Sequence, residues 1–310
     1  MPEALDRLLA AAPGPVEGTL RMAAAAAADV AHAVDVLDTL DRDATPTDPL
    51  DARDPEYIRQ TLPAMRSLSD VYFRGDVRGL ENIPADEPAL LVGNHSGGTL
   101  IADTLVFGQA FYDHFGPERR FHQLAHDLVL KVPGTRATLS RWGTIPASPE
   151  NMRRALGLGA ALLVYPGGDH ETYRPSWQSS DVDFAGRTGF AKLALELGTP
   201  IIPVVAIGGQ ETALFLGRGR RLAKALRLSQ LLRLKVLPVQ FGPPLGLTVL
   251  DLPGRIPLPA KITIRVLPRL HLREQLGDDA DVEDAYRLVT GTMQDTLDDL
   301  SAERALPVIG

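Results

Sequence analysis

The stretch from Leu90 to Asp103 reads Leu-Leu-Val-Gly-Asn-His-Ser-Gly-Gly-Thr-Leu-Ile-Ala-Asp, and it contains residue types that can perform acid–base chemistry. It begins as a short apolar run, typical of a buried strand, and becomes apolar again over a predicted helix. His95 follows the strand and Asp103 lies on the helix. A carboxylate beside one imidazole nitrogen fixes the tautomer and leaves the other nitrogen as a proton acceptor. We interpret His95 as a general base and Asp103 as its orienting partner.

The residues around His95 favour this interpretation over a structural one. A histidine and an aspartate taken at random are more often a turn histidine and a helix cap. Here Asn94 precedes the histidine, and Gly97 and Gly98 follow it in a tight loop. Glycines allow backbone N–H groups to approach a ligand closely. We therefore expect Asn94 to bind substrate and the two glycines to supply backbone donors.

A second polar stretch follows the apolar run at 162–165. The run ends in Tyr-Pro-Gly-Gly, with Gly167 and Gly168, and a strand cannot continue its hydrogen-bond ladder through that proline. Glu171 and Arg174 come soon after the turn. In one interpretation, this stretch is only a turn that ends the strand, and its charged side chains are solvated. We expect the glycines to supply backbone donors and the two charged residues to bind substrate.

A third stretch, from 186 to 204, reads as a helix that feeds a buried strand. Gly198 and Pro200 end the helix. Arg187 and Lys192 lie near its start and could neutralise phosphate groups. Alternatively, these two cations lie on a solvent-exposed face of the helix and bind no ligand.

The arrangement of elements predicts an α/β fold. Apolar runs predict strands at Tyr72–Phe73, Ala89–Val92, His122–Ala125, Gly143–Ile145, Leu162–Tyr165, Ile202–Ala206, Val236–Phe241 and Ile262–Val266. Helical patterns cover Leu20–Leu40, Pro55–Ser69, Leu100–Phe115, Glu150–Leu156, Thr188–Leu197, Leu222–Leu232 and Val282–Leu300. This alternation indicates a mostly parallel mixed sheet flanked by helices, with sites beyond the carboxyl ends of strands. We divide the chain into an N-terminal helical segment (1–70) and an α/β domain that includes the C-terminal helix (71–310).

Composition excludes several classes of protein. The 310 residues include no cysteine, so disulfides, thiolate metal sites and a cysteine nucleophile are ruled out. A net charge of −7 argues against general binding of nucleic acid. No apolar run reaches the roughly 18 residues of a membrane span, and the N-terminus lacks the features of a signal peptide. His122 and His126 resemble a metal pair superficially, but a predicted strand ends between them, and we expect no metal site.

One segment is strongly basic, although the chain as a whole is acidic. Residues 217–235 contain seven basic residues and no acidic one. On a helix, Arg220, Lys224 and Arg227 share one face. A basic amphipathic helix can lie on an anionic bilayer, pack on the core with a solvated face, or bind the phosphates of coenzyme A. We assign these three residues to a membrane surface.

Taken together, these stretches resemble the glycerolipid and lysophospholipid acyltransferase superfamily, most closely its diacylglycerol-acyltransferase-like branch. The resemblance covers roughly Gly75 to Pro268 and rests on motifs in matching order: the His95–Asp103 block, Gly-x-Ile-Pro-x-Ser at Gly143–Ser148, Pro-Gly-Gly-x-x-Glu at Pro166–Glu171, and Arg-x-Gly-Phe-x-Lys-x-Ala at Arg187–Ala194. Two features depart from the usual pattern. Seven residues separate His95 from Asp103, where the superfamily commonly has four. The sequence at 167–171 replaces the Glu-Gly-Thr-Arg of phosphate-acceptor enzymes, which counts against a lysophosphatidate acceptor.

The resemblance implies an acyl-CoA-dependent O-acyltransferase acting on a hydroxyl of a glycerolipid or similar amphiphile. His95 would act as the base, and the thioester would make a metal or bound cofactor unnecessary. The expected partners are acyl-CoA, a lipid acceptor and an anionic membrane, and the expected location is cytoplasmic, peripheral on the inner face of a membrane.

Two alternatives remain from the sequence. The first is a lipid ester hydrolase, although the chain has no Gly-x-Ser-x-Gly elbow. The second is a non-catalytic lipid-binding relative. Acceptor identity, acyl chain length and oligomeric state stay open.

Overall fold

The structure is a computed structural model of the chain. It describes residues 46, 48–95, 97–98, 101–127, 129–131, 136–178, 180–219, 238–242, 246–249, 256–277 and 279–306. The helices predicted at 20–40 and 222–232 lie outside the described residues.

The described elements alternate between helix and strand. The strands are β1 (Asp76–Arg78), β2 (Ala89–Gly93), β3 (Phe121–Ala125), β4 (Thr144–Pro146), β5 (Ala161–Val164), β6 (Ile201–Ile207), β7 (Leu214–Gly217), β8 (Val239–Gly242), β9 (Gly246–Val249) and β10 (Thr263–Val266). The α-helices are α3 (Pro55–Ser67), α4 (Ala102–Phe115), α5 (Arg136–Arg141), α6 (Pro149–Gly157), α7 (Gly168–Thr172), α8 (Gly189–Leu197), α11 (Leu272–Leu276) and α12 (Val282–Glu303). The π-helix η1 (Leu68–Tyr72) and the 3₁₀ turns η2 (Leu80–Asn82), η3 (Val129–Lys131), η4 (Ser176–Gln178) and η5 (Gly209–Thr212) complete the list.

The main sheet has seven strands in the order β1-β10-β6-β2-β5-β3-β4. The five strands from β6 to β4 are parallel, whereas β10 is antiparallel to β6 and parallel to β1. This confirms the predicted mostly parallel mixed sheet. Because β2 lies between β5 and β6, the residues that follow these three strands meet at one edge of the sheet.

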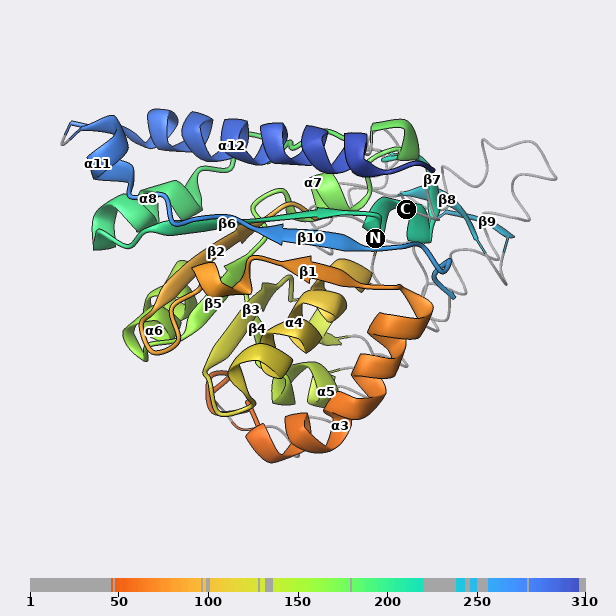
Figure 1. Cartoon of the computed structure of the whole chain (residues 1–310), viewed down its shortest axis with the longest axis horizontal. Helices are drawn as coiled ribbons and strands as arrows, with labels where there is room; N and C mark the ends of the chain where they lie inside the picture. Colours follow the sequence, from red (N-terminus) through yellow and green to blue (C-terminus); the bar gives the residue numbers. More distant parts are fainter. Residues whose placement is uncertain are drawn as a thin grey trace, which may run out of the picture.

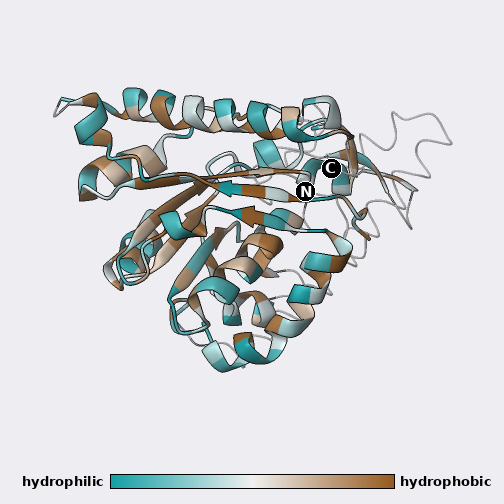
Figure 2. Cartoon of the chain, in the orientation of Figure 1, coloured by the Kyte–Doolittle hydropathy of each residue, from teal (hydrophilic) through white to brown (hydrophobic). Residues whose placement is uncertain are grey.

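Each face of the sheet is covered by helices, with α12 and α8 on one face and α3 and α4 on the other (Figure 1). Successive side chains of a strand point to opposite faces. Leu90 and Val92 of β2 therefore join one core cluster, while Leu91 joins the other. Figure 2 shows the central strands as largely hydrophobic, as expected of a parallel sheet buried on both faces.

The first described helix is integrated into this core. Asp54 caps α3 by accepting a hydrogen bond from the backbone N–H of Tyr57, and a proline follows the cap. Ile58 and Leu62 of α3 pack in the cluster beneath the sheet. The helix predicted at 55–69 is confirmed. The division of the chain at residue 70 stays a prediction.

One predicted strand is helical in the structure, and another is a strand of a second sheet. The residues predicted as a strand at 72–73 instead end a π-helix, which continues directly from α3 and buries Phe73. The residues predicted as a strand at 236–241 contribute β8, which belongs to a separate antiparallel sheet with β7 and β9. Strands β1, β7 and β9 were not predicted from the sequence.

Truncation inside the core tests the packing of α12 on the sheet. Leu297 is fully buried, so Leu297→Ala should lower the free energy of unfolding by about 2–5 kcal/mol, as such truncations do. Asp295 is exposed on the same helix, and Asp295→Ala is the matched control. Urea unfolding followed by circular dichroism measures both. Equal stability of the two variants would contradict this packing.

Candidate active site

The candidate site lies at the carboxyl edge of the parallel strands. His95 leaves β2 two residues after its end, and 95% of its surface is buried. Asn94, just before it, donates from its side-chain amide to the carbonyl of Ala206 and accepts from the N–H of Ala206, both at 2.8 Å. This double hydrogen bond ties the end of β2 to β6. The amide of Asn94 is therefore part of the scaffold and does not face a ligand.

The structure brings His95 and Asp103 together despite the long spacing between them. Nδ1 of His95 lies 3.7 Å from Oδ2 of Asp103, and both side chains are buried. Asp103 is in the first turn of α4, where the helix dipole favours a negative charge. Its Oδ1 accepts the backbone N–H of Thr104 at 2.7 Å. The buried Nδ1 has no hydrogen-bond partner among the described residues. The carboxylate is therefore close to the imidazole, and a small movement would form a hydrogen bond.

An aromatic ring fixes the plane of the imidazole. Tyr165 follows β5, and its ring stacks on His95 with centroids 4.1 Å apart and planes 22° from parallel. The close approach depends on Gly93, because a Cβ there would lie 2.6 Å from the tyrosine ring. The Tyr165 hydroxyl accepts from Oγ1 of Thr104 at 2.9 Å, and burial followed by the nearby Asp103 charge raises the pKa of Tyr165. Sequence reasoning missed Tyr165 as a site residue, although its place before Pro-Gly-Gly was a usable signal.

Glu171 holds the backbone of His95. It is completely buried on α7, with Oε2 accepting the N–H of His95 at 3.1 Å and Oε1 accepting the N–H of Asp183 at 3.0 Å. Burial raises the pKa of Glu171 to about 7, although the Arg174 charge and the two N–H donors favour the ionised form. The structure therefore places Glu171 behind the histidine, where it positions the loop.

Arg174 holds the same loop from its other end. Only 2% of its surface is exposed. Nη2 donates to the carbonyl of His95 at 3.5 Å and Nε donates to Gln210 at 3.3 Å, while Nη1 donates to the carbonyl of Asp181 and lies 3.8 Å from Glu171. A guanidinium with these internal partners is not presented to a phosphate. The glutamate and the arginine together engage the N–H and the C=O of His95.

The four predicted glycines lie beside the histidine, in different roles. Gly97 has φ of +96°, and a Cβ there would lie 2.5 Å from the carbonyl oxygen of Gly209. The N–H of Gly98 donates to the carbonyl of Thr172 at 3.2 Å, and that of Gly168 donates to the carbonyl of Tyr165 at 3.1 Å.

Gly167 lies where a Cβ would meet the carboxylate of Glu171 at 2.2 Å. Glycine at this position therefore makes room for the buried glutamate. The prediction of a turn at Pro-Gly-Gly omitted α7, the short helix that these glycines open.

The two cations of the 186–204 stretch, Arg187 and Lys192, differ in their surroundings. The guanidinium of Arg187 donates to the carbonyl of Gly167 at 2.7 Å and pairs with Asp169 at 2.5 Å, while 36% of its side chain is exposed. It therefore lies beside the Pro-Gly-Gly turn. Lys192 is exposed on α8. Arg220, Lys224 and Arg227 lie outside the described residues.

A second histidine–carboxylate pair joins His170 of α7 to Asp183 and was not predicted. Nε2 of His170 contacts Oδ2 of Asp183. Burial raises the pKa of Asp183, but the hydrogen bonds from His170 and from the N–H of Ala185 outweigh burial and lower it overall. The carbonyl of His170 accepts Nε of Arg218 at 2.9 Å.

His122 is a core histidine. Its Nδ1 contacts the carbonyl of Gly143 at 3.0 Å, and burial lowers the pKa of His122 to about 4. Within the described ranges, no group of three or more histidine, aspartate or glutamate side chains could hold a metal ion.

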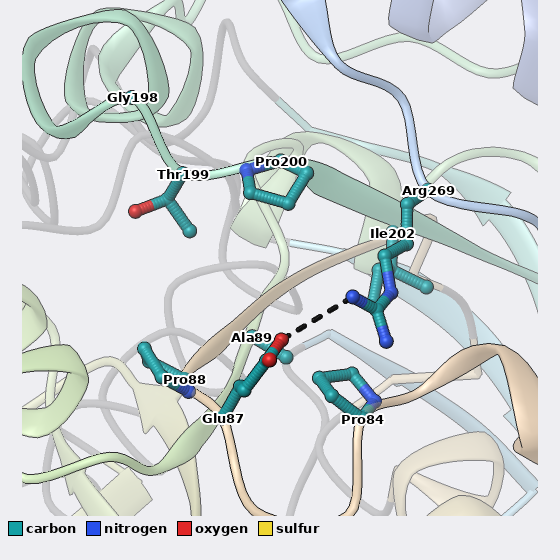
Figure 3. Close-up of a pocket in the computed structure, with 9 residues that line it drawn as sticks. All are labelled: Pro84, Glu87, Pro88, Ala89, Gly198, Thr199, Pro200, Ile202 and Arg269. Atoms are coloured by element: carbon teal, nitrogen blue, oxygen red, sulfur yellow. Dashed lines mark hydrogen bonds and ion pairs between the residues drawn. The ribbon is translucent and has the colours of Figure 1, made fainter.

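A pocket lies away from His95, at the amino ends of β2 and β6 (Figure 3). Its volume is about 260 Å³, and an ion pair between Glu87 and Arg269 (3.4 Å) crosses it. Beyond that pair, its lining is mainly proline, glycine and small apolar side chains. The pocket contains no acid–base pair, and we do not assign the reaction to it.

Comparisons with known proteins find similarity over the part of the chain that contains the candidate site. A family model described as Acyltransferase matches residues 74–207, which include His95, Asp103 and Glu171. An uncharacterised protein of Mycobacterium tuberculosis is 30% identical over 219 residues, which are 71% of this chain and 58% of that protein. A bovine protein named DGAT1/2-independent enzyme synthesizing storage lipids is 32% identical over 198 residues, covering 64% of this chain and 56% of the bovine protein. The chain thus spans just over half the length of these relatives.

The fold is also found among solved structures. The crystal structure of the 1-acyl-sn-glycerophosphate acyltransferase from Thermotoga maritima matches with a TM-score of 0.50 and 18% identity, covering 82% of this chain and 86% of that one. At this identity the likeness concerns the fold alone.

The raised pKa of Glu171 predicts a pH dependence of stability. Its pKa is about 7 when folded and 4.5 ordinarily, so its contribution is complete below pH 4.5 and is lost as pH rises through 7. We compare the free energy of unfolding of the parent with that of Glu171→Gln. The difference, parent minus variant, should fall by about 3 kcal/mol as pH rises from 4.5 through 7. Urea unfolding at pH 4.5 and at pH 8 measures it.

Glu196→Gln is the control, because its stability difference from the parent should change with pH in the opposite direction. The hydrogen bond from Arg153 lowers the pKa of Glu196, so the parent-minus-variant difference should rise with pH. A Glu171 difference that stayed flat or rose with pH would contradict the buried carboxyl.

Proposed function

Given that the chain carries an acyltransferase domain of the glycerolipid acyltransferase superfamily, we propose that it transfers a fatty acyl group from acyl-CoA to a hydroxyl of a glycerolipid or related lipid. The observation that carries this proposal is the buried His95–Asp103 pair at the carboxyl edge of β2, inside the region that the family model matches.

In the proposed reaction, Nε2 of His95 removes the proton of the acceptor hydroxyl. The hydroxyl oxygen attacks the thioester carbonyl, and the C–S bond then breaks as the new ester forms. The imidazolium returns its proton to the departing thiolate of coenzyme A. Asp103, on the Nδ1 side, orients the ring and stabilises the imidazolium. A gap of 3.7 Å is compatible with this role, because catalytic hydrogen bonds often tighten when substrate binds.

The oxyanion of the intermediate needs backbone donors. A donor of this kind contributes about 2.7–4 kcal/mol to the stability of the transition state. We assign this role to backbone N–H groups of the two glycine pairs, Gly97–Gly98 or Gly167–Gly168. In the structure, the N–H groups of Gly98 and Gly168 donate to the carbonyls of Thr172 and Tyr165.

The thioester supplies the activated carbonyl, so the proposed reaction requires no metal or bound cofactor. Arg187 and Lys192 are the proposed contacts for phosphates of coenzyme A. The partly exposed guanidinium of Arg187 lies beside the turn after β5, next to the strand that carries His95. Glu171 and Arg174 position His95 and are not assigned to substrate.

We further propose that the protein works in the cytoplasm, in peripheral contact with the anionic inner face of a membrane. None of the helices in the described part of the chain is long and apolar enough to cross a bilayer. The basic segment at 217–235 supports an electrostatic contact with anionic lipids.

Replacing the proposed base should abolish the reaction. We expect His95→Ala to lower acyl transfer at least about 10²-fold, the lower limit typical of a lost general base, with an unchanged circular dichroism spectrum. His114 is an exposed histidine on α4, so His114→Ala is the matched control and should keep full activity. Mass spectrometry of products from mixed acyl-CoAs and mixed lipid acceptors measures the rate and identifies both substrates.

The same assay separates the alternatives. A folded His95→Ala protein with parental activity would refute the mechanism. Ester hydrolysis without acyl-CoA would point to a lipid hydrolase. Lipid binding with neither reaction would point to a non-catalytic relative.

The stacked tyrosine should affect turnover more than binding. Tyr165→Leu removes the ring that holds the imidazole, and an aromatic contact of this kind is equivalent to about a two- to tenfold change in rate. We expect kcat to fall by that factor with little change in KM, and Tyr165→Phe, which keeps the ring, to fall less. Steady-state kinetics measures both variants. A rise in KM alone would mean that Tyr165 binds substrate and does not position His95.

A further inference from the structure

The small sheet has one face that carries exposed apolar side chains. Leu214 of β7 pairs with Phe241 of β8, which pairs with Leu247 of β9, so the three residues form a row across the sheet. Their exposed fractions are 44%, 53% and 64%. Leu216, further along β7, is 42% exposed. We call these four residues the apolar row.

The opposite face of the same sheet packs against the protein. Phe215 lies between the two exposed leucines of β7 and is fully buried, with its ring 5.9 Å from that of Tyr173. Gln240 of β8 is also buried. This alternation means that the sheet is anchored by one face and presents the apolar row outward. A contiguous apolar patch on an otherwise ordinary surface marks an interaction site.

The sheet is attached directly to the loop of His95. Oγ1 of Thr212, two residues before β7, donates to the carbonyl of Gly97 at 3.4 Å. Arg218, one residue after β7, donates to the carbonyl of His170 on α7. Figure 1 shows β7, β8 and β9 together at one end of the molecule, beyond the carboxyl end of β6. A surface that binds the apolar row would therefore lie next to the candidate site.

The charge of the surrounding chain indicates what binds there. The segment 213–250, which includes all three strands, contains seven basic residues and no acidic one, in a chain of net charge −7. Apolar side chains accompanied only by positive charges match an anionic bilayer, with its negative surface and apolar interior. Trp177 is 69% exposed on η4, and η4 is joined to the edge of β7 by the bond from the N–H of Phe215 to Ser176. Tryptophan is enriched at membrane interfaces.

We propose that the apolar row on β7, β8 and β9 is the surface by which this protein docks on an anionic bilayer. The apolar row enters the interfacial region, and the positive charge that the 213–250 segment carries in the sequence attracts the anionic headgroups. This inference deepens the proposed function, on which it rests, because docking by this face would bring a lipid acceptor close to His95.

Vesicle binding tests the surface without any reaction. The probes are vesicles of equal parts phosphatidylglycerol and phosphatidylcholine, and vesicles of phosphatidylcholine alone. The full chain should co-sediment with the first and much less with the second, and added salt should weaken the binding. The double variant Phe241→Ser/Leu247→Ser should bind the anionic vesicles at least about tenfold more weakly, because two large apolar side chains no longer enter the bilayer.

A matched double variant controls for the loss of exposed apolar residues in general. Val71 (79% exposed) and Leu158 (48% exposed) lie outside the small sheet, so Val71→Ser/Leu158→Ser should bind as the parent does. His95→Ala should also bind as the parent does. The parent could lack acyltransferase activity while the row variant still loses vesicle binding. That result would refute the proposed function but not the docking surface.

Three results would overturn the proposal. The first is parental binding of anionic vesicles by a folded Phe241→Ser/Leu247→Ser protein. The second is failure of the parent to bind anionic vesicles. The third is a change of oligomeric state in which the parent sediments as a dimer, the row variant sediments as a monomer, and vesicle binding is unchanged. The apolar row would then be an interface between two copies of the chain. Circular dichroism and analytical ultracentrifugation of each variant accompany the binding measurements.

Discussion

The buried contact between Glu171 and the backbone N–H of His95 is the interaction on which the candidate site depends. A loop that leaves a buried strand must satisfy its own polar groups, since an unpaired N–H or C=O in the interior costs about 1–3 kcal/mol. Here a glutamate and Arg174 satisfy the N–H and the C=O of the histidine itself. The same two side chains lie 3.8 Å apart, so each partly compensates the charge of the other. The position of His95 thus depends on a charge pair that substrate need not touch.

The parallel sheet and the position of His95 after a strand end were predictable because both depend on local patterns. Short apolar runs separated by helical periodicity require a sheet covered on both faces, and strands β2, β5 and β6 came out within a residue or two of their predicted bounds. The pairing of His95 with Asp103 follows from the same logic, because a helix that starts just after the loop returns its first turn to the strand end. Spacing along the chain mattered less than this geometry.

The roles of the charged residues after β5 could not be read in the same way. A charge in a glycine-rich loop is compatible with either solvent or the interior, and the sequence does not say which side of the chain it occupies. Arg174 is buried because Gln210, 36 residues away, and the carbonyl of Asp181 are available to it. Asn94 is similar, since its partner lies on β6, more than one hundred residues away. Only β8 of the small sheet was predicted as a strand. Its place in a separate sheet depends on its pairing with β7 and β9, which the sequence does not show.

The position of β10 has a consequence for the order in which this fold can form. Strand β1 belongs to the first third of the chain, yet its partner in the sheet is β10, which also pairs with β6. During synthesis, residues 76–78 must therefore wait for nearly two hundred further residues before their hydrogen bonds can be completed. Sheets with such distant pairings fold slowly, because loop closure precedes the gain from contact. Until β10 arrives, the nascent chain exposes an edge of β6, and protection of that edge from other chains falls to the cell's folding machinery.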